Sequence, residues 1–211
     1  MRAPISRGSL VMLANYLRFA VVRGLRSPLQ ESLKRGFDIA GATAGLMLLS
    51  PLIALVSLTI KLESPGPVLC RLRYYDLNDA AFEAFEFRCS TSVSGTNVSN
   101  PAANGDHNIT WIGQILRRSG LDKAPQLINV LRREMSIVGP QPFAVPLGAI
   151  YRAKIAPARL HNVKPGVVSC AQVRDGRDDA TRIEDNCYYL ANRSFLLDMK
   201  ILVLALLIKN T

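Results

Sequence analysis

The sequence predicts a mixed α/β protein, mostly helical, that is built on one membrane helix and stays in a single leaflet. Residues 39–60 contain no charged side chain, and Ser50 and Pro51 lie in the middle of this run. As a helix the run would be roughly 33 Å long, which is enough to cross a hydrocarbon core. Because proline removes a backbone donor and clashes with the preceding turn, we expect this helix to break or to bend sharply.

The charge distribution favours a membrane surface as the partner of the basic residues. The chain of 211 residues has a net charge of +10, and its mean hydropathy of +0.16 is high for a soluble protein but low for a multi-span transporter. Seven basic residues and one acidic residue precede Phe37, so more than half of the excess lies just ahead of the apolar run. Basic residues beside a membrane segment favour the cytoplasmic side and anionic headgroups. We find no zinc, RNP or helix-turn-helix pattern, so no nucleic-acid partner is expected.

The cysteines and histidines predict no structural zinc site. Such a site needs four nitrogen or sulfur ligands, usually in close pairs, and this chain has no Cys-x-x-Cys pair. Both histidines stand alone. Reduced cytosolic thiols are therefore the simpler interpretation. The cysteines are Cys70, Cys89, Cys170 and Cys187.

Three segments are expected along the chain. Residues 1–30 form a basic leader, with an amphipathic helix over Leu10–Val22 that lies on the membrane surface. Residues 31–62 form the membrane helix. Residues 63–211 form a cytoplasmic domain, which begins at a rigid turn over Ser64–Pro67 because its two prolines fix the backbone.

The first half of this domain is expected to contain a hairpin and two helices. Residues 68–90 alternate loosely and predict an irregular β-hairpin, and the polar residues 91–108 predict a mobile surface loop. One helix should run from Thr110 to Arg118 and close at Gly120. A second helix should start after Asp122, with Pro125 in its first turn, and end near Leu131.

The second half is expected to contain a turn, a helix, a strand and an apolar tail. The turn falls at 138–142, the helix at 147–160, and a strand-like segment opens at Lys164-Pro165-Gly166 and runs to Val173. The tail from Tyr188 to Ile208 includes the apolar run Ile201–Ile208. This run is too short to span a bilayer, so we expect it to lie in the interface or to pack on the core.

One short segment carries residues suited to phosphate chemistry. Arg117 and Arg118 come just before Asp122, which stands at the expected start of a helix. A helix N-terminus with nearby guanidinium groups can bind a phosphate, and the same positive charge favours an ionised Asp122 that could act as a nucleophile. The alternative is that Asp122 only caps the helix. Taken alone, this segment favours the cap.

The segment is one of several short motifs that occur in a characteristic order from Lys34 to about Ile201. The motifs are Lys34-Arg35-Gly36-Phe37-Asp38, Leu49-Ser50-Pro51, Ile60–Pro67, Phe87-Arg88, Leu121-Asp122, Pro125-Gln126-Leu127, Asn129-Val130-Leu131, Met135–Pro140, Lys164-Pro165-Gly166, Ala171-Gln172-Val173, Tyr188-Tyr189, Asn192 and Asp198–Ile201. In this order they resemble the bacterial sugar transferase family, the small monotopic phosphoglycosyl transferases that begin exopolysaccharide and glycoconjugate synthesis.

The resemblance implies a re-entrant helix and a reaction at the membrane surface. The Ser50-Pro51 break would turn the helix back to the cytoplasmic face of the bacterial inner membrane, with amphipathic helices at the interface and the active site at headgroup level. The implied substrates are a UDP-sugar, with glucose or galactose as the guess, and undecaprenyl phosphate; UMP is released. Asp122 matches the nucleophile that forms an aspartyl-phosphosugar intermediate, Arg117 matches a phosphate-binding arginine, and Arg118 assists it. A homodimer is left open.

Several positions depart from the family pattern around the same phosphates. Lys123 stands where the family has a glutamate associated with Mg²⁺, and a lysine cannot bind this metal. Lys123 could instead neutralise phosphate charge, or another acid could supply the ligand, so the Mg²⁺ requirement is left open. Gln141 replaces a phosphate-binding arginine, and Glu86 replaces a lysine. These changes raise an alternative, a catalytically impaired paralogue that acts as a membrane scaffold or regulator.

A second group of phosphate-binding candidates lies later in the chain. Lys164 is placed to bind nucleotide or lipid phosphate, although turn formation explains the Lys-Pro-Gly sequence equally well. Arg174 and Arg177 could form a basic cluster that faces the uridine diphosphate. A solvated surface loop is the equal alternative for these two arginines.

Overall fold

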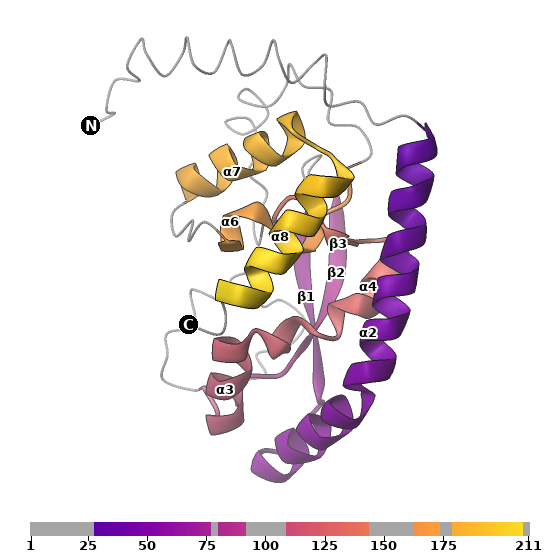
Figure 1. Cartoon of the computed structure of the whole chain (residues 1–211). Helices are drawn as coiled ribbons and strands as arrows, with labels where there is room; N and C mark the ends of the chain where they lie inside the picture. Colours follow the sequence, from indigo (N-terminus) through magenta and orange to yellow (C-terminus); the bar gives the residue numbers. More distant parts are fainter. Residues whose placement is uncertain (1–27, 77–79, 92–108, 144–162, 174–178, 209–211) are drawn as a thin grey trace, which may run out of the picture.

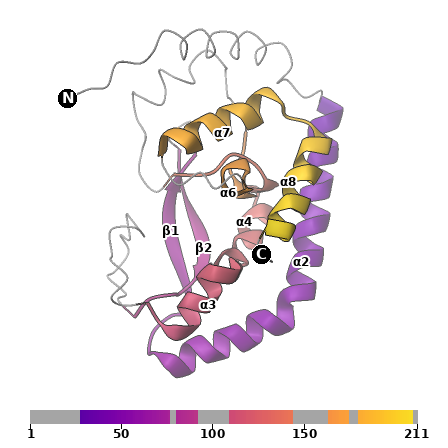
Figure 2. The same ribbon diagram turned by 60° about the vertical axis from the view of Figure 1, so that its left-hand side comes forward.

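The computed structural model describes residues 28–76, 80–91, 109–143, 163–173 and 179–208 (Figure 1). The expected leader helix, nearly all of the polar loop at 91–108, the helix at 147–160, and both Arg174 and Arg177 lie outside these residues. The described part is mixed α/β and mostly helical, as expected. Figures 1 and 2 show a long helix along one side, with the strands and the remaining helices gathered against it.

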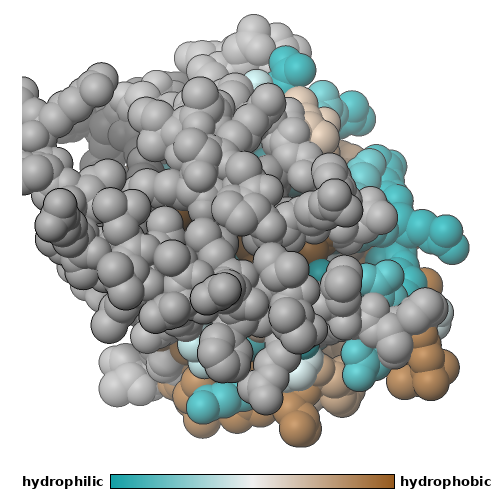
Figure 3. Space-filling model, turned by 90° about the horizontal axis from the view of Figure 1, so that it is seen from above, coloured by the Kyte–Doolittle hydropathy of each residue, from teal (hydrophilic) through white to brown (hydrophobic). Residues whose placement is uncertain are grey.

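The long helix is α2, Pro28–Glu63, and it contains the whole uncharged run. Among the described residues, one helix, Leu29–Glu63, is long and apolar enough to cross a membrane, with a mean hydropathy of 2.1 in its most apolar stretch. Only 11% of that stretch is buried inside the protein, and Leu48 is 80% exposed. A helix buried in a soluble core would hide these side chains. In the view from above, hydrophobic side chains lie along the lower edge and hydrophilic ones to the right (Figure 3).

The helix does not break at Ser50-Pro51. Helical structure continues through Pro51, and Figures 1 and 2 show α2 changing direction along its course. Pro51 cannot donate to the carbonyl of Met47 four residues earlier. The Ser50 hydroxyl donates to this carbonyl instead, at 2.8 Å. The serine therefore satisfies the acceptor that the proline leaves open, which lets the helix continue through the bend.

The expected hairpin is confirmed. Strand β1, Leu69–Tyr75, pairs antiparallel with β2, Ala81–Phe87, and Leu72 lies opposite Ala84. The turn between α2 and β1 is held by Arg88, which is 2% exposed. Its guanidinium donates to the Ser64 and Pro65 carbonyl oxygens at 2.7 and 2.8 Å, so it closes the C-terminal end of α2.

A helical layer follows the hairpin. It consists of α3, Trp111–Ser119, the 3₁₀ turn η2, Leu121–Lys123, and α4, Gln126–Leu131. The first helix matches its expected bounds and closes at Gly120. The second helix begins later than expected, because Pro125 is its N-cap and Asp122 lies in η2.

A short parallel pair and three helices complete the described fold. Strand β3, Ser136–Val138, pairs with β4, Gly166–Val168. Gly139, which follows β3, and Gly166, which begins β4, approach each other so closely that a Cβ atom on either would collide with the backbone of the other. The strand expected up to Val173 was too long, because Cys170–Val173 is helix α6. The last two helices are α7, Asp179–Ala191, and α8, Phe195–Ile208.

Two apolar clusters hold these elements together. One surrounds Val130, Val138 and Tyr189 and includes Ile201 from the tail. The expectation that part of the apolar tail packs on the core is therefore confirmed. The other cluster joins α2 to β2 and α3 through Ile60 and its neighbours. Because α2 also contributes Ala42 to the first cluster, this helix is part of both cores.

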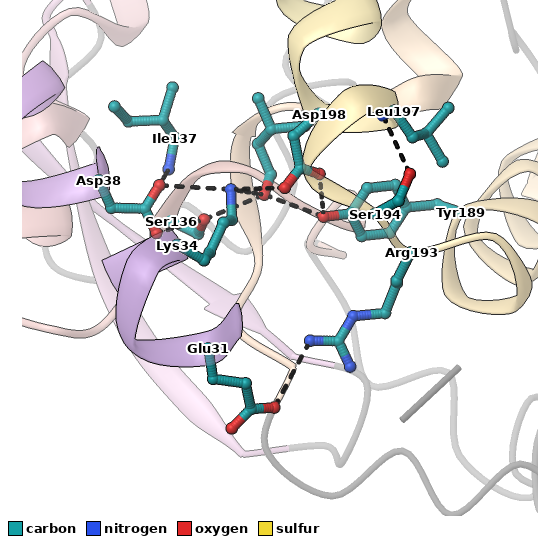
Figure 4. Close-up of polar contacts among 11 residues, drawn as sticks. Glu31, Lys34, Asp38, Ser136, Ile137, Tyr189, Arg193, Ser194, Leu197 and Asp198 are labelled. Atoms are coloured by element: carbon teal, nitrogen blue, oxygen red, sulfur yellow. Dashed lines mark hydrogen bonds and ion pairs between the residues drawn. The ribbon is translucent and has the colours of Figure 1, made fainter. Parts of the chain in front are cut away.

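The start of α2 is fixed by a buried polar network (Figure 4). The ammonium group of Lys34 lies 3.3 Å from Asp38 and 3.2 Å from Asp198. Asp38 accepts hydrogen bonds from Ser136 and from the backbone of β3, and Asp198 accepts one from Tyr189. Buried charges are tolerated when they are paired and hydrogen-bonded in this way.

Candidate active site

Asp122 is positioned by the abrupt end of α3. Gly120 has a φ of 66°, in the left-handed region, and its N–H donates to the Arg117 carbonyl. Glycine adopts this conformation without the steric cost that other residues meet. The reversal directs the chain into η2, where Asp122 and Lys123 are half-buried and the Oδ1 atom of Asp122 is shielded from solvent.

The start of α3 is fixed by α2. The carboxylate of Glu63, at the end of α2, accepts hydrogen bonds from the backbone N–H groups of Trp111 and Ile112 at 2.7 and 3.3 Å. Thr110 caps the same helix by accepting from Gly113. A negative side chain at a helix N-terminus is stabilising. These contacts place the end of the membrane helix next to the helix that leads into η2.

The charges of Arg117 and Asp122 both influence the pKa values of two neighbouring side chains, Cys89 and Tyr74. The pKa of the Cys89 thiol is raised to about 12, mainly by burial, with the negative charge of Asp122 adding to the rise and the positive charge of Arg117 opposing it. Burial likewise raises the pKa of the Tyr74 hydroxyl, on which Asp122 and Arg117 also act. The charges of Arg117 and Asp122 thus influence the same two side chains with opposite sign. Arg118 follows on the exposed face of α3.

Glu86 is a second carboxylate in the neighbourhood of Asp122. It is 8% exposed, and its Oε1 atom accepts hydrogen bonds from the Tyr74 hydroxyl and the Gln126 amide at 2.9 and 2.8 Å. Burial raises the pKa of Glu86, while the positive charge of Lys123 lowers it and the negative charge of Asp122 raises it. From the sequence, Glu86 was recognised only as a departure from the family pattern, which has a lysine at this position. An acid between two phenylalanines at the buried end of a strand was the available signal.

Helix α4 ties the site to β2. Asn129 is fully buried, donates to the Glu83 carbonyl at 2.7 Å and accepts from the backbone N–H of Phe85 at 3.0 Å. The Asn129 side chain thus supplies the edge of β2 with the hydrogen bonds that a neighbouring strand would otherwise make. Helix α4 has only six residues, and Asp122 lies in η2 ahead of it and not at its N-terminus. Phosphate binding here would depend on cationic side chains.

A small apolar hollow lies next to η2. Leu121 and Ala124, which flank the Asp122-Lys123 pair, line it together with Phe87 and with side chains from the region of α2 around the bend. The contributors from α2 are Leu49, Leu52, Ile53 and Val56. The hollow therefore joins the uncharged helix to the residues next to Asp122.

Two other predicted phosphate-binding residues have different partners in the described structure. Gln141 exchanges hydrogen bonds with Asn186 through its backbone, and its side chain accepts one from Ser169 at 3.5 Å. Burial lowers the pKa of Lys164, and the positive charges of Arg35 and Arg133 lower it further. Lys164 thus belongs to a basic group near the start of α2, while Gln141 connects α7 to the turn after β3.

The residues beside Asp122 do not fit a preformed Mg²⁺ site. Among the described residues, no group of three or more His, Cys, Asp or Glu side chains is arranged to hold a metal. Mg²⁺ prefers oxygen ligands, whereas the residue that follows Asp122 in η2 is the cation Lys123. A magnesium ion that accompanied a diphosphate would have to take most of its ligands from the substrate and from water.

Comparison with known proteins decides the family. A family model described as bacterial sugar transferase matches residues 29–209. The chain belongs to the bacterial sugar transferase family. The match begins at the start of α2 and includes the whole of the site around Asp122. The resemblance inferred from the motifs is therefore confirmed.

Several bacterial members of this family are similar over most of the chain. The chain is 37% identical to the UDP-glucose:undecaprenyl-phosphate glucose-1-phosphate transferase of Escherichia coli K12, over 84% of this chain and 40% of the relative. It is 36% identical to the exopolysaccharide production protein PSS of Rhizobium leguminosarum bv. phaseoli, over 81% of this chain and 91% of the relative. It is 34% identical to a UDP-N-acetylgalactosamine-undecaprenyl-phosphate N-acetylgalactosaminephosphotransferase of Aeromonas hydrophila, over 84% of this chain and 43% of the relative.

The chain thus spans less than half of the Escherichia coli and Aeromonas transferases but nearly the whole of the Rhizobium protein.

Proposed function

We propose that this protein transfers a sugar 1-phosphate from a UDP-sugar to undecaprenyl phosphate and releases UMP, as the first step of exopolysaccharide synthesis. The observation that carries the proposal is the position of Asp122 in η2, where its Oδ1 atom is shielded from solvent and the flanking residues Leu121 and Ala124 line an apolar hollow. The names of the relatives support the same reaction class.

In the first step the Asp122 carboxylate attacks the β-phosphorus of the UDP-sugar. A bond forms between the carboxylate oxygen and phosphorus, and the bond from that phosphorus to the bridging oxygen breaks, so that UMP leaves with the bridging oxygen. Arg117 and Arg118 offset the negative charge of the diphosphate. Phosphoryl transfer depends mainly on such positioning and charge neutralisation.

In the second step a phosphate oxygen of the lipid attacks the phosphorus of the aspartyl phosphosugar. The bond from phosphorus to Asp122 breaks, which restores the carboxylate and releases a polyprenyl diphosphosugar. The first isoprene units of the lipid are proposed to lie against the hydrocarbon surface that Leu121, Ala124 and the α2 side chains around Leu52 form.

The reaction is proposed to take place at the cytoplasmic face of the bacterial inner membrane. The exposed apolar surface of α2 supports a lipid environment, and the basic residues before Phe37 suit the cytoplasmic side. The bend at Ser50-Pro51 supports a re-entrant course in one leaflet, in which both ends of α2 remain on the same side.

The sugar is proposed to be glucose or galactose. The Escherichia coli relative is named for glucose and the Aeromonas relative for N-acetylgalactosamine, so all three UDP-sugars should be compared.

The experiment is UMP release by the full chain, purified in detergent, with and without undecaprenyl phosphate and Mg²⁺. We expect lipid-dependent release with at least one of the three sugars, and none with Asp122→Asn. The matched control is Glu83→Gln, which makes the same change at an acid that is 61% exposed in its side chain on β2. Turnover by Asp122→Asn at the rate of the unchanged protein would reject the mechanism.

The covalent intermediate can be sought separately. Incubation with UDP-sugar alone should add a sugar 1-phosphate to the peptide that contains Asp122, detected by mass spectrometry. Because this step needs no lipid, it separates a failure of the nucleophile from a failure of lipid binding. A modified peptide elsewhere in the chain would move the nucleophile away from Asp122.

A further inference from the structure

The side chain of Arg35 has hydrogen-bond donors that the described protein does not satisfy. Its Nη2 atom donates to the Val130 and Leu131 carbonyl oxygens, at the end of α4, at 2.8 and 3.4 Å. The Nε and Nη1 atoms are shielded from solvent and have no hydrogen-bond partner in the part of the chain that the structure describes. Buried donors are almost always paired, and an unpaired donor on a charged group is costly. These two nitrogens are therefore available to an acceptor that does not belong to the chain.

Arg133 lies directly beside this guanidinium group. Its backbone N–H donates to the Val130 carbonyl at 3.1 Å, so Arg35 and Arg133 share one acceptor. Arg133 has a φ of 66°, in the left-handed region that suits glycine and is costly for an arginine. Backbone strain of this kind is concentrated at functional sites. The side chain of Arg133, which is exposed, adds a second positive charge at the end of α4.

Lys164 approaches the same place from the parallel pair of strands. In this pair Ser136 of β3 lies opposite Gly166 of β4. Arg133 comes shortly before β3 and Lys164 shortly before β4, so both segments enter the pair at the same end. The pKa of Lys164 is lowered by burial and by the positive charges of Arg35 and Arg133, which agrees with this arrangement.

The charges of the three cations are not balanced by the described protein. None of them forms an ion pair with another described residue. The two carboxylates of this region have other partners: Asp38 binds Lys34 and β3, and Glu134 accepts a hydrogen bond from Asn129 at 2.6 Å. Water would satisfy the donors of Arg35 but would not offset three positive charges. A phosphate group would do both, because its oxygens match the planar fork of a guanidinium.

The position of this cluster along α2 suits the surface of a membrane. Arg35 is four residues before Ile39, where the uncharged run begins, and four residues rise about 6 Å along a helix. The headgroup region on each side of a bilayer is roughly 5–8 Å thick. The α2 residues that line the hollow beside Asp122 begin at Leu49, about 20 Å further along the helix. The cluster is therefore separate from the candidate active site.

We propose that Arg35, Arg133 and Lys164 bind the phosphate of an anionic phospholipid headgroup and so hold the start of α2 at the membrane surface. The free nitrogens of Arg35 donate to the phosphate oxygens, and the other two cations offset the negative charge. Basic pockets at the cytoplasmic side of membrane helices are suited to anionic headgroups. This inference rests on the membrane location in the proposed function, but it does not depend on sugar transfer.

The test measures binding of short-chain phospholipids to the full chain in a neutral detergent. Binding is followed by the rise in unfolding temperature, because a ligand that binds only the folded state stabilises it. The probes are dioctanoyl phosphatidylglycerol, which is anionic, dioctanoyl phosphatidylcholine, which is zwitterionic, and inorganic phosphate. We expect the Kd of phosphatidylglycerol to be at least about tenfold lower than those of the other two.

Three variants test the assignment residue by residue. Arg35→Lys keeps the charge but loses the planar fork, and it should raise the Kd of phosphatidylglycerol by about tenfold. Lys164→Gln and Arg133→Gly should each raise this Kd by about fivefold. Arg133→Gly should not lower the unfolding temperature of the lipid-free protein, because glycine adopts a φ of 66° without strain. Loss of binding in this variant is therefore separable from loss of the fold.

The matched control is Arg132→Gln, which removes a cation from the adjacent position. The Arg132 guanidinium lies over the ring of Phe85, 4.8 Å from its centre, and so packs on β2. This change should leave the Kd of phosphatidylglycerol within about twofold of the original value. If the phospholipid binds as expected but no UDP-sugar releases UMP, the proposed function fails and the headgroup site stands.

Three results would overturn the proposal. An equal effect of Arg132→Gln and Arg133→Gly would mean that the lipid responds only to the general surface charge. Equal stabilisation by inorganic phosphate and by phosphatidylglycerol would show that the site does not require a lipid. Competition between phosphatidylglycerol and undecaprenyl phosphate in UMP release, lost in Arg133→Gly, would assign the cluster to the lipid substrate instead.

Discussion

The ammonium nitrogen of Lys34 lies 3.2 Å from Oδ2 of Asp198, although the two residues are far apart in the chain. The Asp198 side chain is fully buried and that of Lys34 is 12% exposed. The contact joins the start of α2 to α8, and Lys34 also donates to the Val138 carbonyl at 3.1 Å. The start of α2 is therefore fixed to the domain that carries Asp122, and the orientation of this helix depends on the network.

Replacement of Lys34 should be strongly destabilising. Lys34→Met would leave Asp38 and Asp198 buried without their cation, and loss of one partner from a buried pair costs about 3–5 kcal/mol. Arg71→Met is the control, because its pair with Glu83 is 3.7 Å long and exposed on both sides, so its loss should cost about 1 kcal/mol or less. The measurement is chemical unfolding in detergent. Equal effects of both changes would contradict the structural role of Lys34.

The serine before the proline should stabilise the bend in α2. Ser50→Ala removes the donor to the Met47 carbonyl, and we expect a loss of about 1 kcal/mol. Ser57→Ala is a matched change in the same helix. Its hydroxyl donates to the Ile53 carbonyl, which already accepts the ordinary helical hydrogen bond. A smaller shift in thermal unfolding is therefore expected for Ser57→Ala, and a larger one would count against the compensation at Ser50.

The apolar hollow should affect the lipid step more than the nucleotide step. We expect Leu49→Ala combined with Leu52→Ala to raise the KM for undecaprenyl phosphate by about tenfold, because hydrocarbon contacts are lost. The UMP released in a single turnover without lipid should stay unchanged. Leu48→Ala, on the 80% exposed side of the same helix, is the control. A fall in lipid-independent UMP release would show that the hollow serves the nucleophile instead.

Glu86 should make stability depend on pH in a defined direction. Burial raises the pKa of Glu86 in the folded protein above its ordinary value of 4.5. Ionisation of Glu86 therefore lowers the free energy of unfolding. The loss is complete at a pH above the pKa of Glu86 in the folded protein, and it disappears as the pH falls through that pKa towards 4.5. Glu86→Gln should unfold at a higher temperature than the unchanged protein at pH 8, and the difference should shrink towards pH 4.5. A less stable Glu86→Gln at pH 8 would contradict this sign.

Cys89 should be unreactive in the folded protein. Burial raises its pKa to about 12, so at pH 8 about one molecule in ten thousand carries the reactive thiolate. Alkylation with iodoacetamide, followed by mass spectrometry, should modify Cys89 only after the protein is unfolded. Rapid modification of the native protein at pH 8 would show that the thiol is exposed or ionised.

Local patterns in the sequence predicted the elements whose signals lie close together in the chain. The uncharged run with Ser50-Pro51 predicted a membrane-type helix with a bend, and Gly120 marked the end of α3 because few other residues adopt its left-handed conformation. The order of the motifs was sufficient to identify the family. The parallel strand was overestimated, because its apolar residues up to Val173 suit a short helix as well as a strand.

The sequence by itself determined the family, the apolar helix, the hairpin and the choice of Asp122 and Arg117 as candidates, because each depends on neighbouring residues or on a fixed order of motifs. Tertiary structure alone decided that Glu86 of β2 lies in the field of Lys123 and Asp122 of η2, and that Lys34 reaches Asp198. Those relationships depend on how distant segments pack, and the sequence encodes such packing only through the sum of many weak contacts.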